Sequence, residues 1–171
     1  MCQEYNYKWE CGLFKRYNMK SFKKDDLLVQ IYESRAKMGE AAANDAAATI
    51  VKLLKEKDEI NMIFAAAPSQ NEFLASLILH KEIDWTRVNG FHMDEYVGVD
   101  SSVSQSFVHF LHEAIFDRVP FKQVFCLNGK NEPKAECKRY SELLKKYPVD
   151  IVCMAERLFS RDYEPAWEMK L

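Results

Sequence analysis

The sequence predicts an α/β protein with three layers, a Rossmann-like and mostly parallel sheet flanked by helices. Two observations predict it. Short apolar runs near residues 60–67, 88–93, 124–127 and 149–154 have the composition of buried strands, and segments with helical periodicity separate them. No internal repeat, proline-rich linker or low-complexity segment interrupts the series. Strands that alternate with helices in this way form βαβ units, whose strands run parallel.

The first helix is expected within residues 26–57. This stretch contains an alanine-rich run from Ala41 to Ala48, followed by Ile50, Val51, Leu53 and Leu54. These residues are mostly strong helix formers with an apolar face, so they predict one long helix or two helices joined near Gly39. The short basic cluster just upstream has Asp25 and Asp26 beside it and is interpreted as a solvated helix entrance; it comprises Lys20, Lys23 and Lys24.

The first strand, over residues 60–67, is followed at once by a helix start. Pro68 ends the apolar run. Ser69-Gln-Asn-Glu72 then has the form of a capping box, and an apolar stripe follows it at Phe73, Leu74, Leu77 and Ile78. A second helix is therefore expected to begin near Ser69.

The remaining elements follow in the same alternation. Residues 88–93 are the second expected strand. A third helix is predicted by apolar residues at i, i+3, i+4, i+7 and i+8, namely Phe107, Phe110, Leu111, Ala114 and Ile115. The strand at 124–127 is closed by Asn128-Gly129, and Pro133 lies near the start of a helix with a stripe of Tyr140, Leu143, Leu144 and Tyr147. The fourth strand is expected at 149–154.

The composition is that of a globular protein in water: 48% of the 171 residues are hydrophobic, 29% are charged and the net charge is -2. We therefore expect no nucleic-acid partner and no membrane partner. The five cysteines have no metal-binding spacing, and no signal-peptide run opens the chain, so the cytoplasm is the expected location. Residues 1–18 lack periodicity and are expected to be a disordered extension, with a natural start near Met19.

Adjacent carboxylates at the end of the second strand are the candidate site. In open α/β sheets the ligand crevice lies outside the carboxyl ends of the strands, which is where Asp94 and Glu95 fall. Neighbouring side chains on extended backbone point in opposite directions, so at most one of the two carboxylates would face a substrate. The other could orient a loop or pair with a cation. Gly98 allows a sharp turn behind them. Taken alone, the pair has a second interpretation, a solvated strand end.

A longer stretch around these carboxylates carries a family resemblance. FHMDEYVG at 91–98, SQSFVHFLHEAIFDRVPF at 104–121, LNG at 127–129, the helix with Cys137 and Tyr140, and PVDIVCM at 148–154 closely resemble the glucosamine-6-phosphate deaminase/isomerase family. That family lies within the superfamily that also contains 6-phosphogluconolactonases. The resemblance covers about residues 25–154, the expected N-terminal part of a sugar-phosphate isomerase domain spanning 19–154.

The resemblance implies an enzyme that converts glucosamine 6-phosphate to fructose 6-phosphate and ammonia. It implies that Asp94 is the base that moves a proton between C2 and C1 of the open-chain sugar. It implies no cofactor and no metal, and a small-molecule sugar phosphate as the partner; a homo-oligomer is left open. Ser69, Gln70, His92 and Glu95 are the expected substrate-binding residues.

The sequence departs from the family pattern in two places. The family's first strand leads into a Gly/Ser/Thr-rich phosphate loop, where this chain has Ala65-Ala-Ala-Pro-Ser-Gln70. A loop of the form GxGxxGHxAFN is expected after the fourth strand, but residues 155–171 contain no glycine and no histidine. We therefore expect a C-terminally truncated family domain with an unmatched tail at 155–171, inactive by itself.

Other interpretations of the chain remain open at this point. One is a non-catalytic remnant or binding module that keeps part of the sheet. Another is a hydrolase like 6-phosphogluconolactonase, against which the DEYVG sequence argues. His109 and His112 are three residues apart on a helix with no third ligand at a suitable spacing, so no metal site is expected there.

Overall fold

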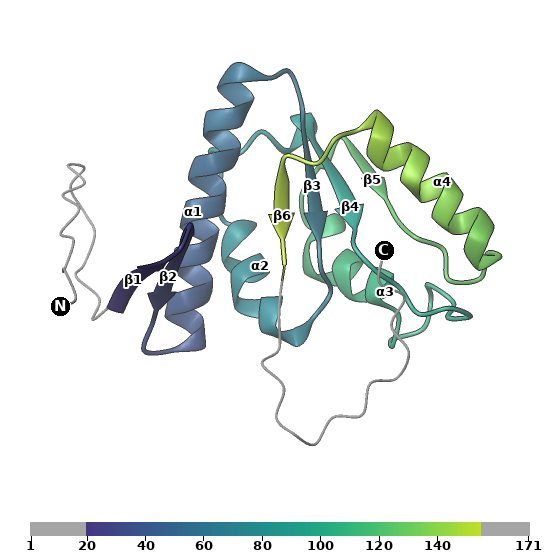
Figure 1. Ribbon diagram of the computed structural model, residues 1–171, viewed down its shortest axis with the longest axis horizontal. Helices are drawn as coiled ribbons and strands as arrows, with labels where there is room; N and C mark the ends of the chain where they lie inside the picture. The colour runs from purple at the N-terminus through teal and green to yellow at the C-terminus, as the bar shows by residue number, and fades with distance from the viewer. Residues whose placement is uncertain (1–19, 155–171) are drawn as a thin grey trace.

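The computed structural model describes residues 20–154 (Figure 1). Its main sheet has four parallel strands in the order β5-β4-β3-β6. The strands are β3 (Ile60–Phe64), β4 (Val88–His92), β5 (Gln123–Phe125) and β6 (Ile151–Cys153). All four expected strands are therefore present, each shorter than its apolar run. The α/β prediction is confirmed.

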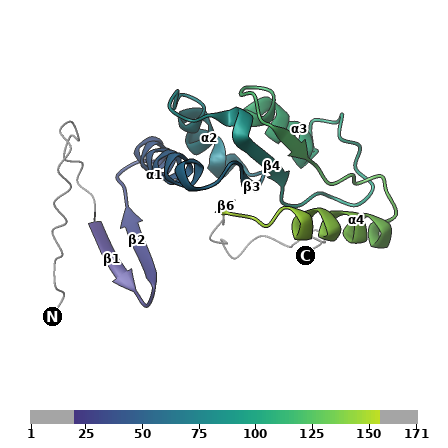
Figure 2. The same ribbon diagram turned by 90° about the horizontal axis from the view of Figure 1, so that it is seen from above.

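Helices cover both faces of this sheet. On one face lie α1 (Arg35–Glu56), α2 (Asn71–Leu77) and α3 (Phe107–Leu111), and α4 (Pro133–Lys146) lies on the other (Figure 2). The short 3₁₀ turns η1 (Pro68–Gln70) and η2 (Trp85–Arg87) precede α2 and β4. A π-helical turn, η3 (His112–Phe116), continues α3. The arrangement has the three layers that the sequence predicts.

The apolar character of the strands follows from this double cover. Phe64 on β3 is fully buried and packs edge to face against Phe116 and Phe121, with ring centroids 5.8 and 6.0 Å apart. Phe91 on β4 contacts Phe125 and Tyr140 on the α4 side, at 4.7 and 6.1 Å. A parallel strand buried on both faces needs apolar side chains in both directions, which is why these runs do not alternate.

The start of the described chain differs from the prediction. Residues expected to enter and begin the first helix form an antiparallel hairpin of β1 (Lys20–Lys24) and β2 (Leu27–Ile31), with Asp25 at the turn at φ 53°. The helix prediction over 26–34 and the interpretation of the lysines were wrong. Four of the five β2 residues are apolar without a regular period, and the alanine-rich helical sequence begins shortly downstream. Helix α1 begins only after Ser34, whose hydroxyl accepts from Lys37 N at 3.3 Å.

The second helix begins where the sequence predicts, but by another device. No side chain caps η1 or α2, so the predicted capping box is wrong. Pro68 opens the 3₁₀ turn. The Glu72 carboxylate accepts hydrogen bonds from Arg35 Nε at 3.0 Å and Nη2 at 2.8 Å. A cation from α1 thus attracts the acidic side chain that the capping box would use.

The other helix predictions are confirmed. Helix α1 is one continuous helix through Gly39, and the third helix spans α3 and η3. Pro133 is the first residue of α4, where the Glu132 side chain caps the backbone. The predicted extension at 1–18 and tail at 155–171 lie outside the described residues. Within residues 20–154 no helix is long and apolar enough to cross a membrane.

Candidate functional site

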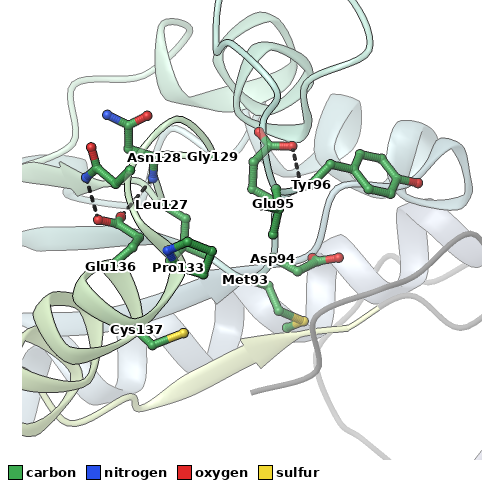
Figure 3. Close-up of a pocket in the computed structure, with 12 residues that line it drawn as sticks. Met93, Asp94, Glu95, Tyr96, Leu127, Asn128, Gly129, Pro133, Glu136 and Cys137 are labelled. Atoms are coloured by element: carbon green, nitrogen blue, oxygen red, sulfur yellow. Dashed lines mark hydrogen bonds between the residues drawn. The ribbon is translucent and has the colours of Figure 1, made fainter.

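A pocket opens at the carboxyl edge of the sheet, between the ends of β4 and β5 (Figure 3). Three segments line it: the turn at 93–97 after β4, the loop after β5, and the first turns of α4. The lining residues are Met93, Asp94, Glu95, Tyr96, Val97, Leu127, Asn128, Gly129, Asn131, Pro133, Glu136 and Cys137. This is the position at which open parallel sheets hold their ligands.

Asp94 and Glu95 diverge, as expected for neighbours on extended backbone (Figure 3). Asp94 is half-buried and lines the pocket. Glu95 is 8% exposed, and its carboxylate accepts four hydrogen bonds. The donors are Ser106 Oγ at 2.6 Å, Tyr96 N at 3.0 Å, Val108 N at 3.1 Å and Phe107 N at 3.2 Å.

These bonds place the Glu95 carboxylate at the N-terminus of α3, beside the N-cap residue Ser106. Burial raises the pKa of the Glu95 carboxyl, but the hydrogen bonds from Ser106, Val108, Tyr96 and Phe107 outweigh it and leave the pKa below its usual value. The ionised carboxylate stabilises the N–H groups of the first helical turn, which have no acceptor within the helix. It also closes the loop from Tyr96 to Ser106. Both oxygens of Glu95 are therefore engaged within the protein, although the residue lines the pocket.

His92 does not reach the pocket. The sequence places it two residues before Asp94, on the same strand face, but its side chain is fully buried. Within residues 20–154 neither ring nitrogen has a hydrogen-bond partner. Burial lowers the pKa of His92 to about 4, with smaller opposing effects from Glu95 and His112. The ring is thus neutral near pH 7 and is not exposed to a ligand in this structure.

Ser69 and Gln70 lie on the neighbouring loop, after β3. Gln70 is 4% exposed and its Nε2 donates to Cys153 O at 2.9 Å, which ties the loop to the end of β6. Ser69 is half-buried in the 3₁₀ turn. Neither residue lines the pocket. Of the five predicted site residues, the structure brings Asp94 and Glu95 to the pocket, places Ser69 and Gln70 on the next loop of the same sheet edge, and buries His92.

Sequence reasoning missed the α4 side of the pocket. Glu136 is 5% exposed, and its carboxylate accepts from Asn128 N at 2.8 Å and Asn131 Nδ2 at 2.7 Å. Arg139 donates to it through Nε at 2.9 Å and Nη2 at 2.5 Å. The hydrogen bonds from Arg139 lower the pKa of Glu136 to about 2 against the effect of burial, with further help from Asn131 and Asn128. A signal was present, because Glu136 lies four residues before Tyr140 and so shares its buried face.

The two pocket loops touch through glycines. Gly98 N donates to Gly129 O at 2.7 Å, and Gly98 has φ +86°, the left-handed conformation that the sharp turn requires. A Cβ on Gly129 would lie 2.4 Å from Tyr96 O. Only glycine therefore lets the loop after β5 approach the turn that carries Asp94.

The chemistry available to the pocket follows from its three carboxylates. Glu95 is held at the α3 N-terminus, Glu136 is held by Arg139 and the loop, and Asp94 is the third carboxylate that lines the pocket. Among the described residues, no group of three or more His, Cys, Asp or Glu could hold a metal ion. A fixed carboxylate at a pocket wall can act as a general base.

Comparison with known proteins gives a consistent result. Residues 33–156 match the family model described as glucosamine-6-phosphate isomerases/6-phosphogluconolactonase. The glucosamine-6-phosphate deaminase of Listeria welshimeri is 34% identical over 94 residues, which are 54% of this chain and 40% of that protein. The enzyme of the same name from Streptococcus suis is 39% identical over 75 residues, covering 43% of this chain and 32% of that protein.

Solved structures share the fold. A 6-phosphogluconolactonase from Thermotoga maritima superimposes with a TM-score of 0.60 at 23% identity, over 67% of this chain and 53% of that one. At this identity the likeness establishes the fold alone. In each comparison the matched part spans roughly half or less of the known protein's length.

Proposed function

We propose, on the premise that the chain belongs to the glucosamine-6-phosphate isomerase/6-phosphogluconolactonase family, that its pocket carries the proton-transfer part of an amino-sugar-phosphate isomerase/deaminase. Glucosamine 6-phosphate is the proposed substrate, and fructose 6-phosphate and ammonia are the products. The observation that carries the proposal is the placement of Asp94, a carboxylate at the wall of a pocket at the carboxyl edge of a parallel sheet.

Asp94 is the proposed base. It takes the C2 proton of the open-chain amino sugar, the electron pair moves onto the C1 oxygen, and this oxygen takes up a proton from water to give an enolamine. Return of the proton to C1 leaves an imine at C2, which water hydrolyses to the ketone with release of ammonia. A positioned carboxylate contributes about 10²–10⁴-fold to such a proton transfer. Glu95 keeps the adjacent loop in place and takes no proton, because its carboxylate is held by four donors.

Hydrolysis of a sugar lactone is the second candidate, because the family and the solved neighbours include 6-phosphogluconolactonases. The two relatives described above, at 34% and 39% identity, are deaminases, which favours the first candidate. Parallel assays with glucosamine 6-phosphate and 6-phosphogluconolactone distinguish the two. Lactone hydrolysis without C2 proton exchange would reject the deaminase proposal in favour of the hydrolase.

We further propose that the 171-residue chain by itself has negligible deaminase turnover. No histidine follows His112 in the sequence, so no group matches the histidine to which the family resemblance assigns ring opening. Loss of a general acid/base typically costs about 10²–10⁴-fold. Ammonia release from glucosamine 6-phosphate measures it. Turnover within about tenfold of a full-length family member would reject this proposal.

The role of Asp94 can be tested without ring opening by the protein, because the sugar ring opens spontaneously in water. The purified chain is incubated with glucosamine 6-phosphate in deuterated water, and loss of the C2 proton is followed by NMR. We expect Asp94→Asn to slow the exchange about 100-fold or more.

Glu95→Gln is the matched comparison. It removes the charge at the α3 N-terminus, so we expect a lower melting temperature, by the equivalent of about 1–3 kcal/mol, and a smaller loss of exchange than in Asp94→Asn. Equal losses of exchange in the two variants would contradict the assigned roles. Wild-type exchange no faster than in buffer alone would reject the proposed function.

A further inference from the structure

Three side chains on one face of α4 reach the exits of β4 and β5. Tyr140 is fully buried, and its hydroxyl lies 2.5 Å from His92 O and 3.1 Å from Phe125 O. One residue earlier, Arg139 Nη2 donates to Cys126 O at 2.8 Å. Helix α4 therefore binds the backbone of both strands where they end.

Glu136 extends this contact to the loop over residues 127–131. Its two carboxylate oxygens each accept one bond from the loop and one from Arg139. A buried carboxylate with this many donors is stabilised as the anion, and each charge-assisted bond is stronger than a neutral one. The loop is closed on itself as well, since Lys130 N donates to Asn128 Oδ1 at 3.0 Å. Glu136 thus fixes a compact loop to the helix.

The same loop contacts the turn that carries Asp94. Gly129 O accepts from Gly98 N at 2.7 Å, and Gly129 lies so close to Tyr96 that a side chain would not fit. A continuous path therefore runs from Glu136 through Asn128 and Gly129 to the turn over residues 94–99. The loop and the turn both line one pocket. Displacing the loop would release the hydrogen bond on Gly98 and with it the position of the turn.

We infer that Glu136 is a positioning residue for Asp94: it holds the loop 127–131 against the turn 94–99 and so fixes the catalytic carboxylate relative to the ligand. The catalytic part of this inference rests on the proposed function, and the loop contact does not. Nothing in the inference requires Glu136 to touch substrate or exchange a proton. A merely stabilising Glu136 would instead support the whole domain equally.

The test compares Glu136→Gln with Glu142→Gln in the full 171-residue chain. Glutamine keeps the shape of Glu136 but turns an amide N–H₂ toward groups that are all donors. Glu142 lies on the same helix and is exposed, so its amide is the matched control. Amide hydrogen exchange is measured at Gly98 N–H, which donates to Gly129 O, and at Ala65 N–H, which donates to Cys153 O elsewhere on the sheet edge.

We expect Glu136→Gln to speed exchange at Gly98 about tenfold or more, while exchange at Ala65 stays within about twofold. Glu142→Gln should change neither. Equal acceleration at Gly98 and Ala65 would show a global effect on stability and overturn the inference, as would unchanged exchange at Gly98. If Glu136→Gln does not fold, Asn131→Ala removes one donor at an exposed position. It should speed Gly98 exchange about threefold by the same route, and unchanged exchange there would also overturn the inference.

C2 proton exchange of glucosamine 6-phosphate gives the catalytic readout. Misplacement of a base lowers the turnover number more than it raises KM, so Glu136→Gln should lower kcat about tenfold with KM within about twofold. A raised KM with unchanged kcat would overturn the positioning role. If the wild type exchanges no C2 proton, the proposed function fails, and the amide comparison still decides whether Glu136 holds the turn.

Discussion

At the scale of single residues, His92 carries the clearest consequence for stability. Its ring is fully buried and its two nitrogens have no partner among the described residues. Burial lowers its pKa from 6.5 to about 4, so the folded protein holds the ring neutral where the unfolded chain binds a proton. Nearby charges act in opposite directions, since Glu95 raises the pKa and His112 lowers it. Desolvation is the larger effect.

We predict that the free energy of unfolding falls as pH is lowered from 7 to 5. In this window the unfolded state takes up a proton at His92 that the folded state does not, so stability rises with pH. The difference between pKa values of 6.5 and about 4 corresponds to a loss of about 2 kcal/mol over these two pH units. The depressed pKa of Glu136, about 2, acts at lower pH, because its contribution is lost only as pH falls below the ordinary carboxyl value.

Denaturant unfolding at pH 7, 6 and 5 measures this dependence. The comparison variant is His92→Leu, which puts an apolar side chain in the buried site and removes the titrating group. Its free energy of unfolding should change by less than half as much as that of the wild type. The same pH dependence of the free energy of unfolding in both proteins would mean that a group other than His92 titrates.

Part of the candidate site could be predicted from the sequence residue by residue. The location of Asp94 and Glu95 at a strand end was predicted, and so was their divergence, because both follow from strand geometry. The contact of Glu95 with the start of α3 could not be predicted. Its partners Ser106 and Val108 approach it through a loop whose path the sequence does not specify. His92 was placed on an accessible face because alternation gives a side chain's direction but not what covers it.

At the scale of elements, the contact between α1 and α2 depends on Gly39. The sequence offered this glycine as a joint between two helices, and the structure has one helix that is buried at that point. An added Cβ would lie 2.6 Å from Glu72 Cβ, 2.7 Å from Glu72 C and 2.8 Å from Phe73 N. Two of these atoms belong to the α2 backbone, which cannot move aside as a flexible side chain does. Gly39 therefore sets the approach of the two helices.

We predict that Gly39→Ala is destabilising, although alanine favours an isolated helix by about 1 kcal/mol. Overpacking at a close backbone contact costs about 1–3 kcal/mol, so the expected net effect is a lower free energy of unfolding. Glu40→Ala, at the exposed neighbouring position, should change stability by less than about 0.5 kcal/mol. Urea unfolding of the three proteins gives the comparison, and a more stable Gly39→Ala protein would contradict the packing argument.

The strands of the main sheet could be predicted from the sequence because their apolar runs differ clearly from the helical segments between them. The four apolar runs became the four parallel strands, of which β3 and β4 are buried along most of their length, and Pro133 is the first residue of α4. The β1–β2 hairpin was missed since it lies beside the strong helical signal of α1 and packs few of its apolar side chains. Phe22, Leu27, Leu28 and Ile31 are all at least half exposed.

At the scale of the whole molecule, the sheet has an open side in the part that the structure describes. Strand β6 pairs with β3 alone there. Its alternate residues differ sharply, with Cys153 buried at 8% exposure and Val152 and Met154 exposed at 55% and 62%. The sequence predicts a strand covered on both faces, and within residues 20–154 only one face has that cover. An apolar edge strand with unpaired backbone groups is a template for pairing with another chain.

We predict that the isolated 171-residue chain associates with itself through β6. Pairing of two such edges would satisfy backbone N–H and C=O groups and cover the apolar side chains of Val152 and Met154 together, which is the usual consequence of an unprotected edge. Val152→Lys should suppress association, because a charged side chain at an edge opposes stacking against an apolar partner. Leu79→Lys is the matched control, since Leu79 is 73% exposed but lies in the turn after α2 and not in a strand.

Sedimentation over a concentration series, with thermal unfolding of each sample, makes the comparison. Association should persist in Leu79→Lys and disappear in Val152→Lys. A wild-type chain that stays monomeric and unfolds in one sharp, cooperative transition would contradict the prediction, and would mean that β6 is protected in solution.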